Sequence, residues 1–397
     1  MGWKATPNWN GPTIPVTPVP NRRFFPLDQK LQLRADHWSE GAARVATHQG
    51  LQAKSFALAA QAYTEAVGGS ISGDSLQRIT EGWGSQVQDR RQAEAERANL
   101  PGQREESPRA RRVPESRPIA GAANLSTDGA MVLVRAEGWK EVKLVAVSAV
   151  TVKTAGERAR HTPRPSRRAG DPLVALSDHS YQAGLWEADT MALHQYAEGL
   201  RRGLDQAAPL SSVNDGARWI ERITDLNFAH ATQVVDWSHA SQRLWLVANT
   251  VLGDQSPAAR AWAGTQLDDL WQGEVVAVKQ NLVALDLDRA AWPAEVREAP
   301  GYFEHNQARM RYADFRAAGV PTPAPTAEQV RVGSGTVESA ATTVVHHTCT
   351  CRRCKCRLRR PGRGWNRDNA QAMLAGLSEL HSGRFAQAWQ ASLPNAQ

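Results

Sequence analysis

The segment Ser126-Thr127-Asp128-Gly129-Ala130-Met131-Val132-Leu133-Val134 decides the fold, because it joins an acidic turn to an apolar run. The run 130–134 and a second one at 142–152 are rich in valine, which favours strands. We predict two strands here, joined around Gly138. A third predicted strand covers 173–181 and follows a basic, proline-bearing loop.

Helix and strand patterns alternate after these three strands. A helix is predicted at 188–204, with one apolar face made by Leu193, Tyr196, Ala197 and Leu200. A fourth strand ends at Asn214-Asp215, and a fifth, at 232–235, ends at Asp236. Three strands followed by alternating helix and strand predict an α/β domain with a mixed sheet.

The region before this domain is expected to be helical over 38–100. Gly68 to Gly73 interrupts the pattern, and either Asp74 or Ser75 can cap the next helix. A helix, a glycine-bearing turn and a second helix are typical of a helix-turn-helix DNA-binding domain. Any antiparallel helical hairpin has the same outline.

The remaining segments differ in composition. Residues 1–37 are proline-rich at the start and are expected to be poorly ordered. Residues 101–119 are charged and contain proline, which is typical of a linker. Helical periodicity returns from 240 to about 318, and a proline- and glycine-rich connection follows. A last amphipathic helix is predicted at 368–389.

Charge and cysteine content narrow the class of protein. The 397 residues contain 47 lysines and arginines against 40 acids, a net charge of +7. That balance is compatible with a polyanionic partner but does not require one. We find no apolar run of the roughly 20 residues that span a bilayer, and no secretory signal. These features predict an intracellular protein that has no membrane contact.

Three carboxylates lie on distinctive local motifs: Asp128, Asp215 in Asn214-Asp215-Gly216, and Glu338 in 333-GSGTVES-339. Taken singly, an Asp-Gly pair is most often a turn, and Glu338 can be a capping or surface residue. Together, two acids on strands and one at the start of a helix suit a pair of hard divalent cations for phosphodiester chemistry.

Several segments carry a resemblance to a known family. They are 128-DGAMVLVRAEGWKEVKL-144, 213-VNDGARWI-220, 234-VVDWSHASQRLW-245, 302-YFEHNQARMRY-312 and the GSGTVES segment. They resemble the DDE transposases of bacterial insertion sequences, of the Kra type, which are related to Mutator-like transposases. The resemblance runs from about residue 25 to residue 389.

The resemblance implies a ribonuclease-H-like catalytic core at 120–239 and 333–390, interrupted by a helical insertion and loop at 240–332. It implies that Asp128, Asp215 and Glu338 are the catalytic residues and ligate two Mg²⁺ (or Mn²⁺) ions. Asp236 and His239 match a box that follows the fifth strand, and we expect a supporting role for them. The alternative role for Asp236 is to cap the helix after it.

The same resemblance implies a bacterial cytoplasmic protein that associates with the nucleoid, and it implies the partners. These are double-stranded DNA at the terminal repeats and target DNA, with two copies of the chain handling two ends. A dense basic run follows Glu338 and is expected to contact phosphates, although a solvated charged loop has the same composition. Its members are Arg352, Arg353, Lys355, Arg357, Arg359, Arg360, Arg363 and Arg367.

The cysteines lie together, at Cys349, Cys351, Cys354 and Cys356. Structural zinc sites usually draw ligands from two separated segments, so we do not expect zinc here. The N-terminal residues 1–24 lack the paired cysteines common in relatives, and Thr322 to Val332 is an extra loop. Two alternatives therefore stay open: a degenerate transposase that only binds DNA, and a nuclease without strand transfer.

Overall fold

The computed structural model describes residues 38–100, 116–153, 173–285, 287, 290–317, 344 and 364–393. The chain forms two compact units, Met1–Val45 and Ala46–Gln397, and their boundary falls inside helix α2 (Glu40–Gln52). The second unit holds the sheet and the elements described below. Among the described residues, no helix has the length and apolar character needed to cross a membrane.

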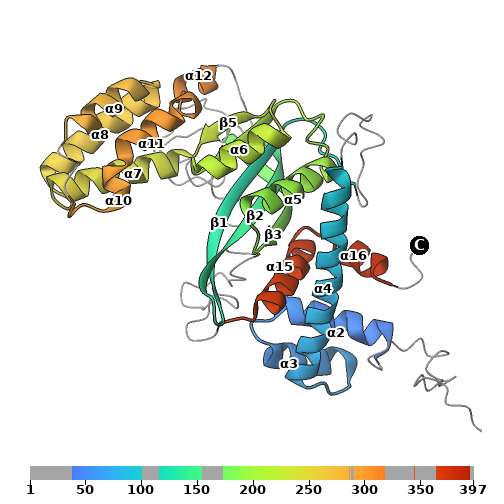
Figure 1. Cartoon of the computed structure of the whole chain (residues 1–397). Coiled ribbons are helices and arrows are strands. Elements are labelled where there is room, and N and C mark those ends of the chain that lie inside the picture. The colour runs from blue at the N-terminus through green and yellow to red at the C-terminus, as the bar shows by residue number, and fades with distance from the viewer. Residues whose placement is uncertain are drawn as a thin grey trace, which may run out of the picture. The chain divides into compact units, whose positions relative to one another are not determined.

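The second unit is built on a five-stranded mixed sheet (Figure 1). Its strands are β1 (Ala123–Val134), β2 (Gly138–Lys153), β3 (Leu173–Gly184), β4 (Leu210–Asn214) and β5 (Thr232–Val235). They lie in the order β3-β2-β1-β4-β5. β1, β2 and β3 pair antiparallel, whereas β4 pairs parallel with both β1 and β5. The predicted α/β class with a mixed sheet is confirmed.

Strand β1 is longer than predicted, because it begins at Ala123 rather than at Ala130. Its first half carries buried polar side chains that bond to one another. Asn124 donates to Ser126 Oγ at 2.9 Å and accepts from Ser211 Oγ at 3.0 Å. Because these polar side chains are buried and hydrogen-bonded to one another, this segment does not show the alternation of apolar and polar residues by which a strand is recognised from sequence. The prediction that Asp128 opens the strand is therefore wrong, since Asp128 lies in its middle.

Helices α5 (Ala188–Arg201) and α6 (Arg218–Asn227) pack against one face of the sheet. The shared core contains strand residues and helix residues at helical spacing: Leu125, Val145, Val147, Met191, Ala192, Tyr196, Leu200 and Ile223. Each of these side chains is almost fully buried. Burial of this apolar face fixes both helices on the sheet.

The helices before the sheet begin at serines. Ser55 caps α3 (Phe56–Val67) by accepting from Leu58 N, and Ser72 caps α4 (Gly73–Ala98) by accepting from Ser75 N. The prediction that Asp74 or Ser75 caps this second helix is wrong. The prediction of one continuous helix through Ser55 is also wrong, because α2 ends at Gln52 and a new helix begins after Ser55. A serine side chain can accept a hydrogen bond from a free backbone amide of the first turn, which favours a helix start at this position.

The region after β5 is helical over its described part, as predicted. It contains α7 (Trp237–Leu252), α8 (Pro257–Gln272), α9 (Val275–Val283), α10 (Ala294–Arg297), α11 (Ala299–Asn306), the 3₁₀ turn η3 (Gln307–Arg309) and α12 (Tyr312–Ala317). The core of these helices includes Leu244, Val247, Val278, Leu282 and Phe303. It also contains Val213 of β4 and Val234 and Val235 of β5, so the helices pack against the sheet. Figure 1 shows them grouped on the β5 side of the sheet. The predicted loop that follows lies outside the described residues.

The last predicted helix, 368–389, is two helices in the structure, α15 (Arg367–His381) and α16 (Phe385–Ala391). Between them Gly383 has φ of +70°, in the left-handed region that ends helices. Ser382 accepts a hydrogen bond from Tyr181 N at 2.9 Å, which attaches this turn to β3. α15 also packs along α4.

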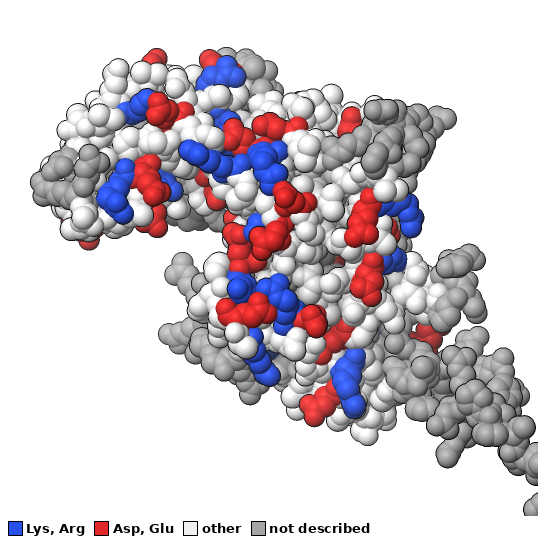
Figure 2. All heavy atoms as spheres, in the orientation of Figure 1, with Lys and Arg blue, Asp and Glu red and all other residues white. Residues whose placement is uncertain are grey.

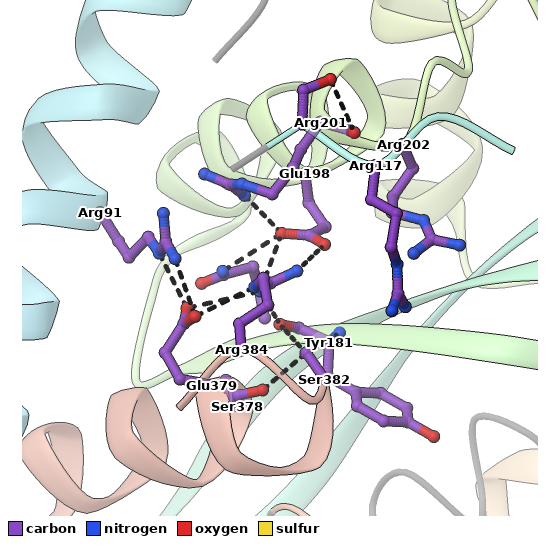
Figure 3. Close-up of polar contacts among 12 residues, drawn as sticks. Arg91, Arg117, Tyr181, Glu198, Arg201, Arg202, Ser378, Glu379, Ser382 and Arg384 are labelled. Carbon is purple, nitrogen blue, oxygen red and sulfur yellow. Dashed lines mark hydrogen bonds and ion pairs between the residues drawn. The ribbon is translucent and has the colours of Figure 1, made fainter. Parts of the chain in front are cut away.

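A buried network of charges joins α4, α5 and α15 (Figure 3). Arg384 lies between Glu198 and Glu379, at 2.8 and 3.0 Å. Arg91 pairs with Glu379 at 2.7 Å, and Arg201 pairs with Glu198 at 2.5 Å. Burial alone would raise the pKa of Glu198, but the charges of Arg384 and Arg201 bring that pKa to about 2. Every carboxylate of this network therefore has a cationic partner, as burial requires.

Candidate active site

The register of β1 with β4, continued three residues beyond their last paired residues, aligns Asp128 with Asp215. The parallel pairing of β1 with β4 runs from Ala123 opposite Leu210 to Leu125 opposite Ser212, and it sets each residue beside the one 87 positions later. Asp215 follows Asp128 by the same interval. β1, which contains Asp128, and β4, which ends directly before Asp215, are thus neighbours in the sheet.

A hydrogen bond connects the two strands directly before the two acids. Thr127 N donates to Asn214 Oδ1 at 2.7 Å, directly before Asp128 on one strand and Asp215 on the other. Residues in register on parallel strands project to the same face of the sheet. Continued to Asp128 and Asp215, this register assigns both residues to the face opposite that of Leu125, which packs on α5 and α6.

Asp236 follows β5 at the position that corresponds to Asp215 after β4. β4 pairs with β5 from Ser211 opposite Thr232 to Asn214 opposite Val235, so the next residues along are Asp215 and Asp236. Asp236 N donates to Asn214 O at 2.7 Å, which keeps the two strands together at this point. Asp236 is buried, with 2% of its surface exposed.

Asp236 also begins the first helix of the following region. Its Oδ1 accepts from Ser238 N at 2.7 Å, and α7 starts at the residue between them. The capping alternative for Asp236 is confirmed. His239 lies half-buried in the first turn of α7. A supporting catalytic role for both residues stays a prediction.

The turn after Asp215 can only be made with glycine. Gly216 has φ of +87°, and a Cβ there would lie 2.9 Å from Asn306 Oδ1 and 3.1 Å from the Tyr302 hydroxyl. Asp215 Oδ1 accepts from Ala217 N at 2.9 Å, which orients its carboxylate over the turn. Positive φ and close packing both exclude a side chain at this position.

Helix α11 holds this turn from the other side. The Tyr302 hydroxyl donates to the carbonyl oxygen of Asp215 at 2.9 Å. Burial raises the pKa of Tyr302 well above its usual value; the charge of Arg243 opposes this rise and that of Asp215 adds to it. Tyr302 therefore stays a neutral hydrogen-bond donor and does not act as a base near neutral pH.

Asp128 lies half-buried in the middle of β1. Its Oδ1 accepts from the neighbouring Gly129 N at 2.7 Å. Carboxylate oxygens are the ligands that Mg²⁺ prefers, so Asp128 and Asp215 fit a hard divalent cation in donor type. Among the residues that the structure describes, no group of three or more His, Cys, Asp or Glu is close enough to hold a metal ion.

The third predicted ligand, Glu338, lies outside the described residues, as do the four cysteines. So does the basic run apart from Arg367. Arg367 forms an exposed ion pair with Glu137 at 2.7 Å, and the hydrogen bond from Arg367 lowers the pKa of Glu137. Its predicted phosphate contact stays a prediction.

A cavity of about 600 Å³ adjoins Asp215, between the start of α6 and helices α7, α10 and α11. Its lining includes Arg218, Arg243, Arg297 and Tyr302. The sequence-based site did not include these residues, because no local pattern sets them apart from other surface arginines and tyrosines. They come together only when the helices after β5 fold against the sheet.

The visible face of the molecule carries both signs of charge. In Figure 2, basic and acidic side chains of the described residues are interspersed.

Comparison of the chain with known protein families and with curated proteins finds no match.

Proposed function

We propose that this chain is a DDE-type DNA transposase, which cuts DNA strands at insertion-sequence ends and joins them to target DNA. The single observation that carries the proposal is the parallel pairing of β1 with β4, whose register aligns Asp128 with Asp215 when it is continued by three residues. We further infer that the sheet is a ribonuclease-H-like core. Its strand order, with three antiparallel strands followed by two parallel ones, supports that inference.

In this proposal Asp128, Asp215 and Glu338 hold two Mg²⁺ or Mn²⁺ ions. Such ions, when bound, stabilise the attacking and leaving oxygens of an in-line displacement at phosphorus. The protein contributes the position of the ligands. Asn214 and Thr127 keep the two strands in register, and the turn at Gly216 fixes the direction of the Asp215 carboxylate.

The helical region after β5 supports the site mechanically. Tyr302 bonds to the Asp215 backbone, and Asp236 connects β5 to α7 through its capping hydrogen bond. Arg309 forms an ion pair with Glu221 on α6 at 3.1 Å, and His305 Nε2 lies 2.7 Å from the same carboxylate oxygen. A site on rigid strands that is braced by helices is well ordered before substrate arrives, which favours catalysis.

The test is cleavage of duplex DNA carrying a terminal repeat, with Mg²⁺ or Mn²⁺, by the full chain. Wild type should nick the strand and form joined products, whereas Asp215→Asn should bind DNA without cutting it. Asp254→Asn is the matched control, because Asp254 is an exposed acid in the turn before α8. Cleavage retained in Asp215→Asn would reject the proposal. DNA binding without cleavage by wild type would favour the degenerate transposase, and cleavage without joining would favour a nuclease.

A further inference from the structure

The cavity beside Asp215 carries an excess of positive charge. Arg218, Arg243 and Arg297 line it, against the acids Asp215 and Glu298. Neither Arg218 nor Arg297 forms an ion pair with any carboxylate of the described residues, and both side chains are exposed. Arginines without acidic partners around one opening are typical of a site for an anion.

The third arginine is held in place by its surroundings. Arg243 packs its guanidinium over the Tyr302 ring, 4.3 Å from the ring centre, and donates to Glu295 O at 3.1 Å. A guanidinium fixed by stacking keeps donors available for a ligand while losing little conformational freedom on binding. Arg243 therefore forms a rigid wall of the cavity.

A buried acceptor in the cavity wall also indicates a ligand. Asn306 is 1% exposed, and its Nδ2 donates to Tyr302 O at 2.9 Å. Its Oδ1 has no hydrogen-bond partner among the described residues. A buried acceptor left without a donor is costly, so a group that carries a donor is expected next to it.

Size and position narrow the class of ligand. A cavity of about 600 Å³ falls within the range in which proteins bind ligands of nucleotide size. A phosphate group can accept hydrogen bonds from the arginines. A base or sugar can donate a hydrogen bond to Asn306 Oδ1, which has no other donor among the described residues. Asp215 belongs to the cavity lining, so a ligand there lies beside the carboxylate that acts on DNA in the proposed function.

We propose that this arginine cavity, lined by Arg218, Arg243 and Arg297, binds a nucleotide of the DNA strand through its backbone phosphate. This inference rests on the proposed function, because it takes the bound anion to be DNA. Arg218 is three residues after Asp215, while Arg243 and Arg297 belong to the helices that follow β5. Binding in the cavity thus places the strand relative to Asp215 and makes those helices part of the DNA-binding surface.

The test is the salt dependence of DNA binding, measured without divalent cations so that no cleavage takes place. The probe is a fluorescent duplex of arbitrary sequence, titrated with the full chain between low and physiological salt. Each lost phosphate contact lowers the slope of log K against log salt by about 0.9. Arg218→Gln with Arg297→Gln should reduce this slope by about 1 to 2 and weaken binding about tenfold or more.

The matched control is Arg260→Gln, an exposed arginine on α8 outside the cavity, which should leave the slope unchanged. Thermal melting establishes that the variants fold. Wild-type affinity and slope in the folded double variant would overturn the proposal, as would a wild type that does not bind the duplex. If wild type binds with the expected slope change but never cleaves, the phosphate site stands and the catalytic proposal fails.

Discussion

The Tyr302 hydroxyl donates a hydrogen bond to the backbone carbonyl of Asp215, 87 residues earlier in the chain, at 2.9 Å. A residue of α11 thus fixes the turn that carries a candidate metal ligand. The helices after β5 interrupt the chain between two parts of the predicted catalytic core, yet they contribute to its geometry. We expect removal of these helices to disturb the turn that carries Asp215.

Replacing Tyr302 tests this support directly. Tyr302→Phe removes the hydroxyl and leaves the Asp215 carbonyl without its donor, while the ring beneath Arg243 remains. The expected loss is about 1 kcal/mol of folding free energy, the net worth of one such hydrogen bond. Urea unfolding measures this loss, and DNA cleavage should fall because the Asp215 turn is less constrained. Wild-type cleavage by the variant would show that the contact does not matter for the site.

Metal binding offers a test that does not depend on DNA. Asp128→Asn removes one charged ligand from the matched pair and should weaken Mn²⁺ binding by at least about tenfold, the lower end of what even an outer-shell change costs a metal site. Mn²⁺ titration followed by electron paramagnetic resonance measures the affinity. The exposed Asp254→Asn serves as control. Equal Mn²⁺ affinity in Asp128→Asn and Asp254→Asn would show that Asp128 is not a metal ligand.

Gly216 should not tolerate a side chain. Gly216→Ala places a Cβ at positive φ and within 3.1 Å of both Asn306 and Tyr302, so the turn must shift. Positive φ alone costs about 1 to 2 kcal/mol for a residue with a Cβ. Gly264→Ala is the control, since Gly264 lies within α8 with open space around it. There the same change should stabilise the helix by up to about 1 kcal/mol. Thermal melting distinguishes the two directions.

The sequence predicted the sheet better than it predicted the site. The sequence correctly placed Asp215 and Asp236 directly after the fourth and fifth strands. The first half of β1 was missed because Asn124 and Ser126 satisfy each other through hydrogen bonds. The contact of Tyr302 with Asp215 depends on packing between residues far apart in the chain, which no local pattern encodes.

The buried charges between α4, α5 and α15 should dominate the response to substitution. Glu198→Gln leaves Arg201 and Arg384 without their shared carboxylate in a fully buried place. Breaking a buried pair in this way costs about 3 to 5 kcal/mol. Asp189→Asn removes an exposed carboxylate paired with Arg222 and should cost less than about 1 kcal/mol. Chemical denaturation compares the two, and similar losses would mean that the network adds no more than a surface pair.

Stability should also depend on pH through His194. Burial, together with the charges of Arg201 and Arg91, lowers the pKa of His194 from 6.5 to about 3. The ring stacks on Trp186, with the ring centres 3.8 Å apart, and bonds through Nε2 to Gln92. The unfolded chain takes up a proton below pH 6.5 while the folded protein does not. The folded state is therefore favoured fully above pH 6.5 and progressively less as pH falls toward 3.

The expected slope from this one group approaches about 1.4 kcal/mol per pH unit in the lower part of that window. Urea unfolding at several pH values between 6.5 and 3 measures it in the wild type. His194→Gln stays neutral throughout and should lower stability at every pH by loss of the Trp186 stack. Its slope over the same window should nevertheless be smaller than that of wild type, because one proton-binding group is gone. Parallel curves for the two proteins would contradict a neutral, buried His194, since the unfolded chains would then gain no proton that the folded ones lack.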